Sequence, residues 1–383
     1  MRVGIVTEYY RPWPGGITEH VHHEAEELVA RGHAVSIITG PAGPDWVDGD
    51  VADVVRLRHE WRLTHNGALS RMTLGSYLFN MRRLLRRLRF DVVHVHAPMD
   101  PFLGLWTLRA AECPLVGTFH ANFEPAPEWN ALFRGLSFFT RPAWEKLQCR
   151  IAVSSEAERS ISHYFPGEYE IIPNGVDTER FNPGLAPMAD LADGRPTILF
   201  VGRADPRKGL PMLLEAFREI RKRVPGARLV VVGVERGEVE SLLLPLGPDT
   251  VEDILFEGYV DAADMASYFA SCHVFCSPAN GQESQGIVLL EAMAAGRPPV
   301  AFAIPGYRDV IDHDVDGWLI DDVGVEPLAA GLCRLLRDEV RAKRLGEAGR
   351  ATALGYSWPR VIERVEAQML LARERAAGAA PRP

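Results

Sequence analysis

The sequence predicts an α/β protein built from two Rossmann-like domains in tandem. Short apolar runs without polar alternation recur along the chain, and most are followed by a segment with helical spacing. This order is typical of buried parallel strands joined by crossover helices. The alternation is interrupted at residues 181–196, where proline and glycine are frequent, and then resumes. Because 383 residues are too many for one compact core, we expect a domain on each side of this linker.

The composition is that of an ordinary globular protein. Hydrophobic residues make up 47% of the chain and charged residues 24%, with a formal net charge of −9, which argues against a nucleic-acid partner. Five scattered cysteines indicate free thiols in a reducing compartment. No apolar run reaches the roughly 20 residues that a membrane span needs. We therefore expect a cytoplasmic protein, at most attached peripherally to the inner face of the cell membrane.

The first domain opens with a buried strand at residues 3–7 and a loop that contains Gly15 and Gly16. Two glycines allow a phosphate or a sugar to approach the backbone closely. A dinucleotide-binding G-x-G-x-x-G motif does not follow the strand. A helix is predicted over residues 18–31, with Thr18 as its N-cap. This helix carries three histidines, which we expect on a solvated polar face rather than at a metal: His20, His22 and His23.

After a strand at residues 34–39, residues 41–65 are expected to be irregular, with one short strand near Val54. Residues 79–90 predict a helix with a basic side. Two interpretations stay open: an ordinary amphipathic surface helix, or a basic face for anionic phospholipid headgroups. The basic residues are Arg82, Arg83, Arg86 and Arg87.

Two further strands of the first domain carry histidines. His94 and His96 alternate along the strand at residues 91–96 and therefore share one face. His120 ends the next strand, at residues 115–120. Ligands of open parallel sheets bind at the carboxyl ends of the strands, so we expect His120 in a functional cleft.

The second domain begins with a strand at residues 197–201, after which Arg203 and Lys208 flank a loop. Two cations at the end of a strand suit a diphosphate, although they could also be ordinary surface cations. A further strand ends at Val260.

The most informative stretch is residues 280–296, which predicts a loop that leads into a short buried helix at residues 286–295. The first backbone N–H groups of such a helix have no internal partners, so a phosphate could bind over Ile287 and Val288. Glu283 precedes the helix, and Glu291 lies one turn below Ile287, within reach of a hydroxyl pair. The simpler alternative is one salt-bridged glutamate on a core helix.

The chain is predicted to end with helices near 325–337 and 340–353 and a last helix at residues 357–375. This last helix is expected to pack back on the first domain, and the tail at residues 376–383 is expected to be disordered. The domains are thus placed at residues 1–180 and 197–356.

These motifs resemble those of the retaining glycosyltransferases of family 4. Members of that family have the GT-B fold, two Rossmann-like domains that face each other across a cleft. The most specific motif is E-x7-E, from Glu283 to Glu291, and the similarity extends from Val3 to about Glu366. The other matching motifs are Pro14-Gly15-Gly16, Thr118-Phe119-His120, residues 172–177 and residues 202–209.

The resemblance implies a role for each matching residue. The first domain would bind the acceptor, and the second a nucleotide-sugar donor. His120 would contact the donor sugar near the reacting carbon and Glu283 its hydroxyls, which makes these two the catalytic residues. No metal or other cofactor is strictly required in this family. The implied donor-binding residues are Gly16, Arg203, Lys208, Val260, Gly286, Ile287, Val288 and Glu291, the last on the ribose.

Within the family, the sequence is similar to the phosphatidylinositol mannosyltransferases, which use GDP-mannose. Asn66 and Arg71 would then approach the inositol phosphate of the acceptor. Gln285 stands where that group has Phe, so an alternative stays open: a transferase that uses a UDP-sugar, glucose or GlcNAc, for exopolysaccharide or soluble glycoside synthesis. Other departures are His65, Thr73 and Met265, where that group has Tyr, Arg and Lys.

Overall fold

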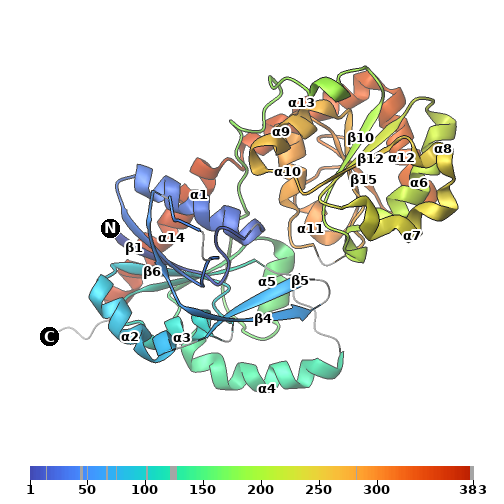
Figure 1. The fold of residues 1–383 in the computed structure, drawn as a ribbon. Helices are drawn as coiled ribbons and strands as arrows, with labels where there is room; N and C mark the ends of the chain where they lie inside the picture. Colours follow the sequence, from blue (N-terminus) through green and yellow to red (C-terminus); the bar gives the residue numbers. More distant parts are fainter. Residues whose placement is uncertain are drawn as a thin grey trace. The chain divides into compact units, whose positions relative to one another are not determined.

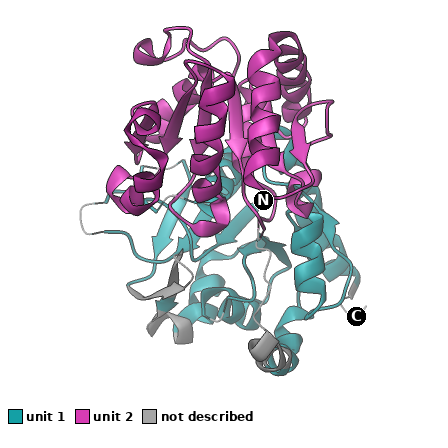
Figure 2. Cartoon of the chain, turned by 90° about the vertical axis from the view of Figure 1, so that its right-hand side faces the viewer, with its two compact units in different colours: residues 1–174, 358–383 teal, residues 175–357 magenta. Residues whose placement is uncertain are grey.

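The computed structural model contains two compact units (Figure 2). Unit 1 comprises Met1–Asn174 and Trp358–Pro383, and unit 2 comprises Gly175–Ser357, so residues 181–196 belong to unit 2. The structure describes residues 1–13, 15–43, 46–49, 51–65, 68–74, 76–100, 102–120, 127–281 and 283–379. For residues 59–65, 68–72, 74, 76–79, 127–134 and 136 only the backbone is described.

Unit 1 is organised around a seven-stranded sheet in the order β3-β2-β1-β6-β7-β8-β9, and all neighbouring strands are parallel. Its central strands are buried along nearly their whole length, as their continuous apolar runs predict. The order reverses between β1 and β6, which creates the switch point typical of Rossmann-like sheets. The strands are β1 (Arg2–Val6), β2 (Ala34–Thr39), β3 (Asp53–Arg56), β6 (Val92–His96), β7 (Leu115–Phe119), β8 (Cys149–Ala152) and β9 (Glu170–Ile171).

Helices cover both faces of this sheet (Figure 1). On one face, α14 packs against α1, β6, β7 and β8, so the C-terminal helix belongs to unit 1. It continues to Ala379, beyond the predicted end at residue 375. On the other face, α3 contacts both α2 and α4. The helices are α1 (Gly16–Ala30), α2 (Ser76–Leu88), α3 (Leu103–Ala110), α4 (Pro127–Trp144), α5 (Ser155–Ser162) and α14 (Trp358–Ala379).

Two local predictions for unit 1 were wrong. Helix α1 begins at Gly16, and Thr18 lies inside it, where its hydroxyl donates to the carbonyl of Trp13 at 2.8 Å instead of capping the helix. Besides the expected β3, the region after β2 contains an antiparallel hairpin, β4 (His59–His65) and β5 (Ala68–Leu74). Among the described residues these two strands pair only with each other and do not join the buried sheet. Because only strands of the buried sheet need a continuous apolar run, the sequence pattern did not indicate them.

Unit 2 repeats this architecture with a six-stranded parallel sheet in the order β12-β11-β10-β13-β14-β15. Both units are therefore Rossmann-like, which confirms the predicted fold class. The strands are β10 (Thr197–Val201), β11 (Arg228–Val232), β12 (Ile254–Gly258), β13 (Val274–Ser277), β14 (Pro299–Phe302) and β15 (Trp318–Ile320). The helices are α6 (Leu210–Arg223), α7 (Glu240–Leu243), α8 (Pro248–Val251), α9 (Ala262–Ser271), α10 (Ile287–Ala294), α11 (Pro305–Arg308), α12 (Val325–Arg337) and α13 (Glu339–Leu354).

The loops after β10 and β13 touch at the carboxyl edge of the unit 2 sheet. Gly209 has a φ of +74°, and a Cβ at this position would lie 1.9 Å from the carbonyl oxygen of Pro278. The N–H of Asn280 also donates to the carbonyl of Arg207 at 3.2 Å. A glycine is therefore required where these two loops meet.

Candidate active site

The structure brings two separately predicted motifs together at this edge of unit 2. Lys208 follows β10 and Glu283 follows β13, and the Lys208 Nζ lies 2.6 Å from the Glu283 Oε1. The two side chains are only 26% and 17% exposed. A cation and a carboxylate are thus held at the edge where Rossmann-like sheets bind ligands.

The neighbouring arginines differ in how they are held. Arg207 pairs with Asp205, with its Nη2 at 2.5 Å from the Oδ2, and the Asp205 carboxylate also accepts from the Arg207 N–H. The hydrogen bonds from Arg207 lower the pKa of Asp205. Arg203 is exposed. The Arg203 side chain is therefore accessible to a ligand.

The Glu283 loop is fixed by close packing. A Cβ at Gly306 would lie 2.4 Å from the carbonyl oxygen of Glu283, and a Cβ at Gly286 would lie 2.6 Å from the ring of Tyr307. The hydroxyls of Tyr307 and Ser277 lie 2.7 Å apart and are buried. Since the loop has no room to shift toward these groups, the position of Glu283 is determined by the core beneath it.

Helix α10 begins where the sequence predicted. Gly286 is in the left-handed region, with a φ of +81°, and no described side chain caps the helix. The half-buried Ile287 and Val288 form its first turn, and Glu291 follows one turn later. Uncapped N–H groups at a helix start favour an anion. Val260 also follows a strand at this edge, β12, and packs on the core of unit 2.

In unit 1, a buried network of histidines surrounds Glu24 of α1. The Glu24 Oε1 lies 2.6 Å from the His94 Nδ1, and the Oε2 lies 3.1 Å from the His96 Nε2. The His94 Nε2 is 2.6 Å from the hydroxyl of Thr118. The His96 Nδ1 is 2.8 Å from the His120 Nε2. The predicted catalytic histidine is therefore linked through His96 to a buried carboxylate.

The expectation of a solvated histidine face on α1 was wrong. His20 is 1% exposed and His22 is 7% exposed, and His23 stacks on Trp358 of α14. His20 joins the buried network, with its Nδ1 at 2.9 Å from the Oδ1 of Asn174. The strand neighbours of α1 supply polar partners for this face. Gly16 lies at the exposed start of the same helix.

Burial keeps several of these imidazoles neutral. It lowers the pKa of His120 well below the usual range and, with His94, lowers the pKa of His96 to about 3. Burial alone would raise the pKa of Glu24, but His94 and His96 outweigh it and hold that pKa well below its usual range. At neutral pH His120 is thus a neutral hydrogen-bonding group.

Glu8 forms a second buried acidic site at the end of β1. Its carboxylate accepts from the N–H of Thr73 at 2.9 Å, from the Thr73 hydroxyl, and from the N–H of Leu103 at 3.0 Å. These bonds attach β5 and α3 to the sheet. Burial and the Glu8 charge raise the pKa of the nearby Asp100 to about 8.

The four arginines of α2 are exposed, but two of them are paired. Arg82 and Arg86 both contact the carboxylate of Glu112, each at 2.6 Å. Arg83 and Arg87 form no ion pair with a described residue. Arg71, which the resemblance assigns to acceptor binding, lies in β5 opposite Arg62, and Asn66 is outside the described residues. Among the helices of the described chain, none is both long and apolar enough to cross a bilayer.

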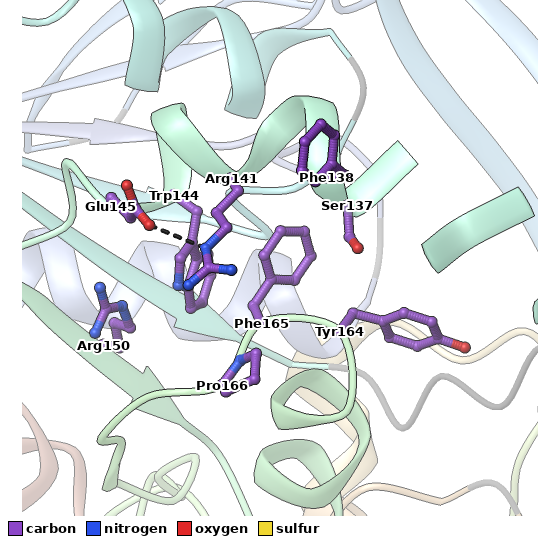
Figure 3. Close-up of a pocket in the computed structure, with 9 residues that line it drawn as sticks. All are labelled: Ser137, Phe138, Arg141, Trp144, Glu145, Arg150, Tyr164, Phe165 and Pro166. Carbon is purple, nitrogen blue, oxygen red and sulfur yellow. Dashed lines mark hydrogen bonds and ion pairs between the residues drawn. The ribbon is translucent and has the colours of Figure 1, made fainter. Parts of the chain in front are cut away.

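Unit 1 also has an aromatic hollow that the sequence did not suggest. Figure 3 shows this hollow, which has a volume of about 210 Å³ and is lined by Phe138, Trp144 and Phe165 among others. Phe138 and its neighbour Phe139 on α4 are 74% and 73% exposed. None of the predicted site residues lines the hollow.

Comparison with known proteins identifies the family. Residues 14–180 match the family described as Glycosyltransferase Family 4, and residues 188–352 match Glycosyl transferases group 1. The chain is 36% identical over 369 residues to a phosphatidyl-myo-inositol mannosyltransferase of Mycobacterium leprae, and the aligned residues cover 95% of each chain. The chain belongs to the family 4 glycosyltransferases. Glu283 and Glu291 of this glycosyltransferase therefore form the E-x7-E motif of the family.

Other relatives agree with this family. The glycosyltransferase is 29% identical over 364 residues to the GDP-mannose-dependent alpha-(1-6)-phosphatidylinositol monomannoside mannosyltransferase of Mycobacterium tuberculosis, covering 91% of this chain and 92% of the other. Among solved structures, sucrose-phosphate synthase from Thermosynechococcus elongatus superimposes with a TM-score of 0.77 at 21% identity, over 99% and 100% of the chains. Anabaena HepE in complex with UDP and glucose gives 0.74 at 16%, over 97% and 99%. These structures share the GT-B fold.

Sequence reasoning did not single out Glu24 or Glu112, and it named Asn174 only as part of the motif at residues 172–177, without a role. One signal for Glu24 was available, because it lies four residues after His20 and therefore on the same side of a helix. The partners of the other two residues lie 154 and at least 26 positions away in the chain.

Proposed function

We propose that this glycosyltransferase moves a mannosyl residue from GDP-mannose to phosphatidylinositol or a related glycolipid, with retention at the anomeric carbon. The observation that carries the proposal is the Lys208–Glu283 pair beside the start of α10, in a chain that is 36% identical to enzymes named as phosphatidyl-myo-inositol mannosyltransferases. Unit 2 would bind the donor and unit 1 would bind the acceptor.

On the donor side, Arg203, Lys208 and the N–H groups of Ile287 and Val288 would stabilise the negative charge that develops on the departing diphosphate. Lys208 already contacts one oxygen of Glu283, so the remaining lone pairs of that carboxylate would accept from the sugar hydroxyls. Glu291 would accept from the ribose hydroxyls. The Lys208–Glu283 pair and the start of α10 are held in place without a donor, which limits the reorganisation that the reaction needs.

His120 would act on the sugar as a neutral group. Its Nε2 is engaged with the His96 Nδ1, which leaves Nδ1 as the ring nitrogen for a substrate contact. Burial lowers its pKa far below neutral pH, so it would not add a positive charge beside an anomeric carbon that itself becomes positive. A neutral imidazole is therefore compatible with the transition state.

On the acceptor side, Asn66 and Arg71 would approach the inositol phosphate, and unit 1 would lie on anionic lipid. Two features support the membrane contact: Arg83 and Arg87 of α2 are exposed, and α4 exposes Phe138 and Phe139. Helix α3 contacts both α2 and α4, so the basic and aromatic groups belong to one layer of helices. Cationic and aromatic side chains together are typical of interfacial binding.

An assay with purified protein tests the proposal. GDP-mannose, UDP-glucose and UDP-GlcNAc are each supplied with phosphatidylinositol vesicles or with water alone, and the products are identified by mass spectrometry. We expect a mannosylated lipid from GDP-mannose only. Turnover of a UDP-sugar without turnover of GDP-mannose would refute the mannose assignment.

That second outcome would identify a transferase for exopolysaccharide or soluble glycosides. The observation in its favour is Gln285, a buried polar side chain beside Gly286, 3% exposed. A Gln285→Phe variant separates the two cases, because it restores the residue of the similar mannosyltransferases. If the donor is a UDP-sugar, this change should lower the rate of transfer from that UDP-sugar.

A further inference from the structure

Three buried atoms of unit 1 converge on one point. His20, Glu24 and His96 each offer one ligand atom, and these ligand atoms lie within 4.8 Å of one another. The unpartnered atoms of the three residues are the Nε2 atoms of His20 and His96 and the Oε2 of Glu24. The Glu24 Oε2 is 3.6 Å from the His20 Nε2 and 3.1 Å from the His96 Nε2, but neither approach has hydrogen-bond geometry. None of the three atoms has a hydrogen-bond partner among the residues that the structure describes.

The other ring nitrogen of each histidine and the other carboxylate oxygen of Glu24 each have a hydrogen-bond partner. The His20 Nδ1 lies 2.9 Å from the Oδ1 of Asn174, and the His96 Nδ1 lies 2.8 Å from the His120 Nε2. The Glu24 Oε1 accepts from the His94 Nδ1 at 2.6 Å. Metal-binding histidines have this arrangement, in which one ring nitrogen binds the metal and the other donates to a neighbour that fixes the ring.

Electrostatics also calls for a cation at the point of convergence. His20 donates through Nδ1 to an amide oxygen, so its neutral ring directs a lone pair at Nε2 toward the Glu24 carboxylate. Two lone pairs that face each other in a buried site repel, and a buried carboxylate needs a compensating charge. The His94 Nδ1 satisfies the Oε1 of Glu24 at 2.6 Å, but the Oε2 still faces two imidazole nitrogens, at 3.6 and 3.1 Å.

We propose that unit 1 binds a divalent transition metal ion, Zn²⁺ or a similar ion, through the His20 Nε2, the Glu24 Oε2 and the His96 Nε2. In a tetrahedral site with bonds of about 2.0–2.1 Å, ligand atoms are about 3.3–3.4 Å apart. The observed separations of 3.1 and 3.6 Å bracket that value. Two imidazoles favour a transition metal over Mg²⁺ or Ca²⁺, which prefer oxygen ligands.

The ion would connect α1 to β6 and orient His96. With its Nε2 on the metal, His96 carries its proton on Nδ1 and donates to the His120 Nε2, which fixes His120 with its proton on Nδ1. The metal would thus be a positioning group for His120. This last consequence rests on the proposed role of His120 in transfer, whereas the metal site does not depend on the sugar or the acceptor.

Metal binding is measured directly on the full-length protein without substrate. Chelator-stripped protein is titrated with Zn²⁺ against a chromophoric competitor, and a Co²⁺-loaded sample is examined by visible and X-ray absorption spectroscopy. We expect one ion per chain, the intense visible bands of four- or five-coordinate Co²⁺, and a first shell of N and O atoms with two imidazoles. Absence of stoichiometric binding to the wild-type protein overturns the proposal, even if mannosyl transfer is established.

Variants test the ligand set. Glu24→Gln, which keeps the size of the side chain, and His20→Ala are each expected to weaken Zn²⁺ binding by roughly 100-fold, of the order found for perturbed metal sites. His163→Ala removes an exposed histidine and should leave one ion bound with unchanged affinity. Circular dichroism checks that each variant is folded. If folded Glu24→Gln binds Zn²⁺ as tightly as the wild type, the proposed site is wrong.

Discussion

Replacing Glu283 by glutamine separates a catalytic role from a structural one. The change removes the charge that pairs with Lys208 but keeps the shape of the side chain. Ion pairs that are partly open to water contribute about 0.2–1 kcal/mol, so the free energy of unfolding should fall by no more than about 1 kcal/mol. A lost hydrogen bond between a charged group and a sugar hydroxyl is larger, about 1.5–3 kcal/mol, which corresponds to about a 10- to 150-fold loss of kcat/KM.

The assay compares urea unfolding with the initial rate of transfer from GDP-mannose. Glu326→Gln is the matched control, because Glu326 is also ion-paired in unit 2, with Arg223 at the end of α6. Because Glu326 is more exposed than Glu283, its replacement should lower stability by no more than Glu283→Gln does, and it should leave kcat/KM unchanged. If Glu283→Gln retains kcat/KM within about twofold, its proposed contact with the sugar is refuted.

A double-mutant cycle with Lys208→Met asks whether Glu283 acts only by orienting the lysine. In that case Glu283→Gln would have no further effect once Lys208 is absent. We expect an additional loss of kcat/KM in the double variant, because the carboxylate is proposed to contact the sugar itself.

Three further predictions follow from the geometry. Gly209→Ala should lower the free energy of unfolding by more than Gly226→Ala does. Gly226 also has a positive φ, but it has open space around it, so its replacement costs only the left-handed backbone conformation, about 1–2 kcal/mol. Equal losses in the two variants would contradict the close contact between the loops at Gly209. Because the pKa of Asp100 is raised to about 8, the folded protein keeps a proton that the unfolded chain releases near pH 4. The free energy of unfolding should therefore fall as the pH rises from about 4 to about 8. Urea titrations should show that Asp100→Asn flattens this pH dependence. Replacing Arg83 and Arg87 by alanine should weaken binding to anionic vesicles by about 30-fold, at about 1 kcal/mol per charge, without changing binding to neutral vesicles; unchanged anionic binding would exclude this face.

The loop and helix proposed to bind the donor could be placed from sequence because their determinants are local. The loop with Glu283, the glycine before the helix and the first turn at Ile287 all lie within one short stretch, and α10 begins within one residue of the predicted start. Strand and helix alternation similarly indicated two Rossmann-like units. The turns could be recognised by their glycines and the buried strands by their apolar runs.

The hairpin β4–β5 shows where local reasoning failed. Within the described residues its strands pair with each other and not with the buried sheet, so their pattern resembles that of irregular chain. What attaches this hairpin to the sheet is the bonding of Thr73 to Glu8, residues that are 65 positions apart.

The sequence by itself thus determined the fold class, the family and the position of the motifs proposed to bind the donor, all of which depend on short-range spacing. Only the tertiary structure decided what surrounds His120. Helix α1 has a polar pattern that predicts a solvated face, yet His20 and Glu24 are buried because β6, some 70 residues further along the chain, places His94 and His96 against that face. Burial of polar groups depends on whether distant partners meet them, and that depends on the order of the strands in the sheet.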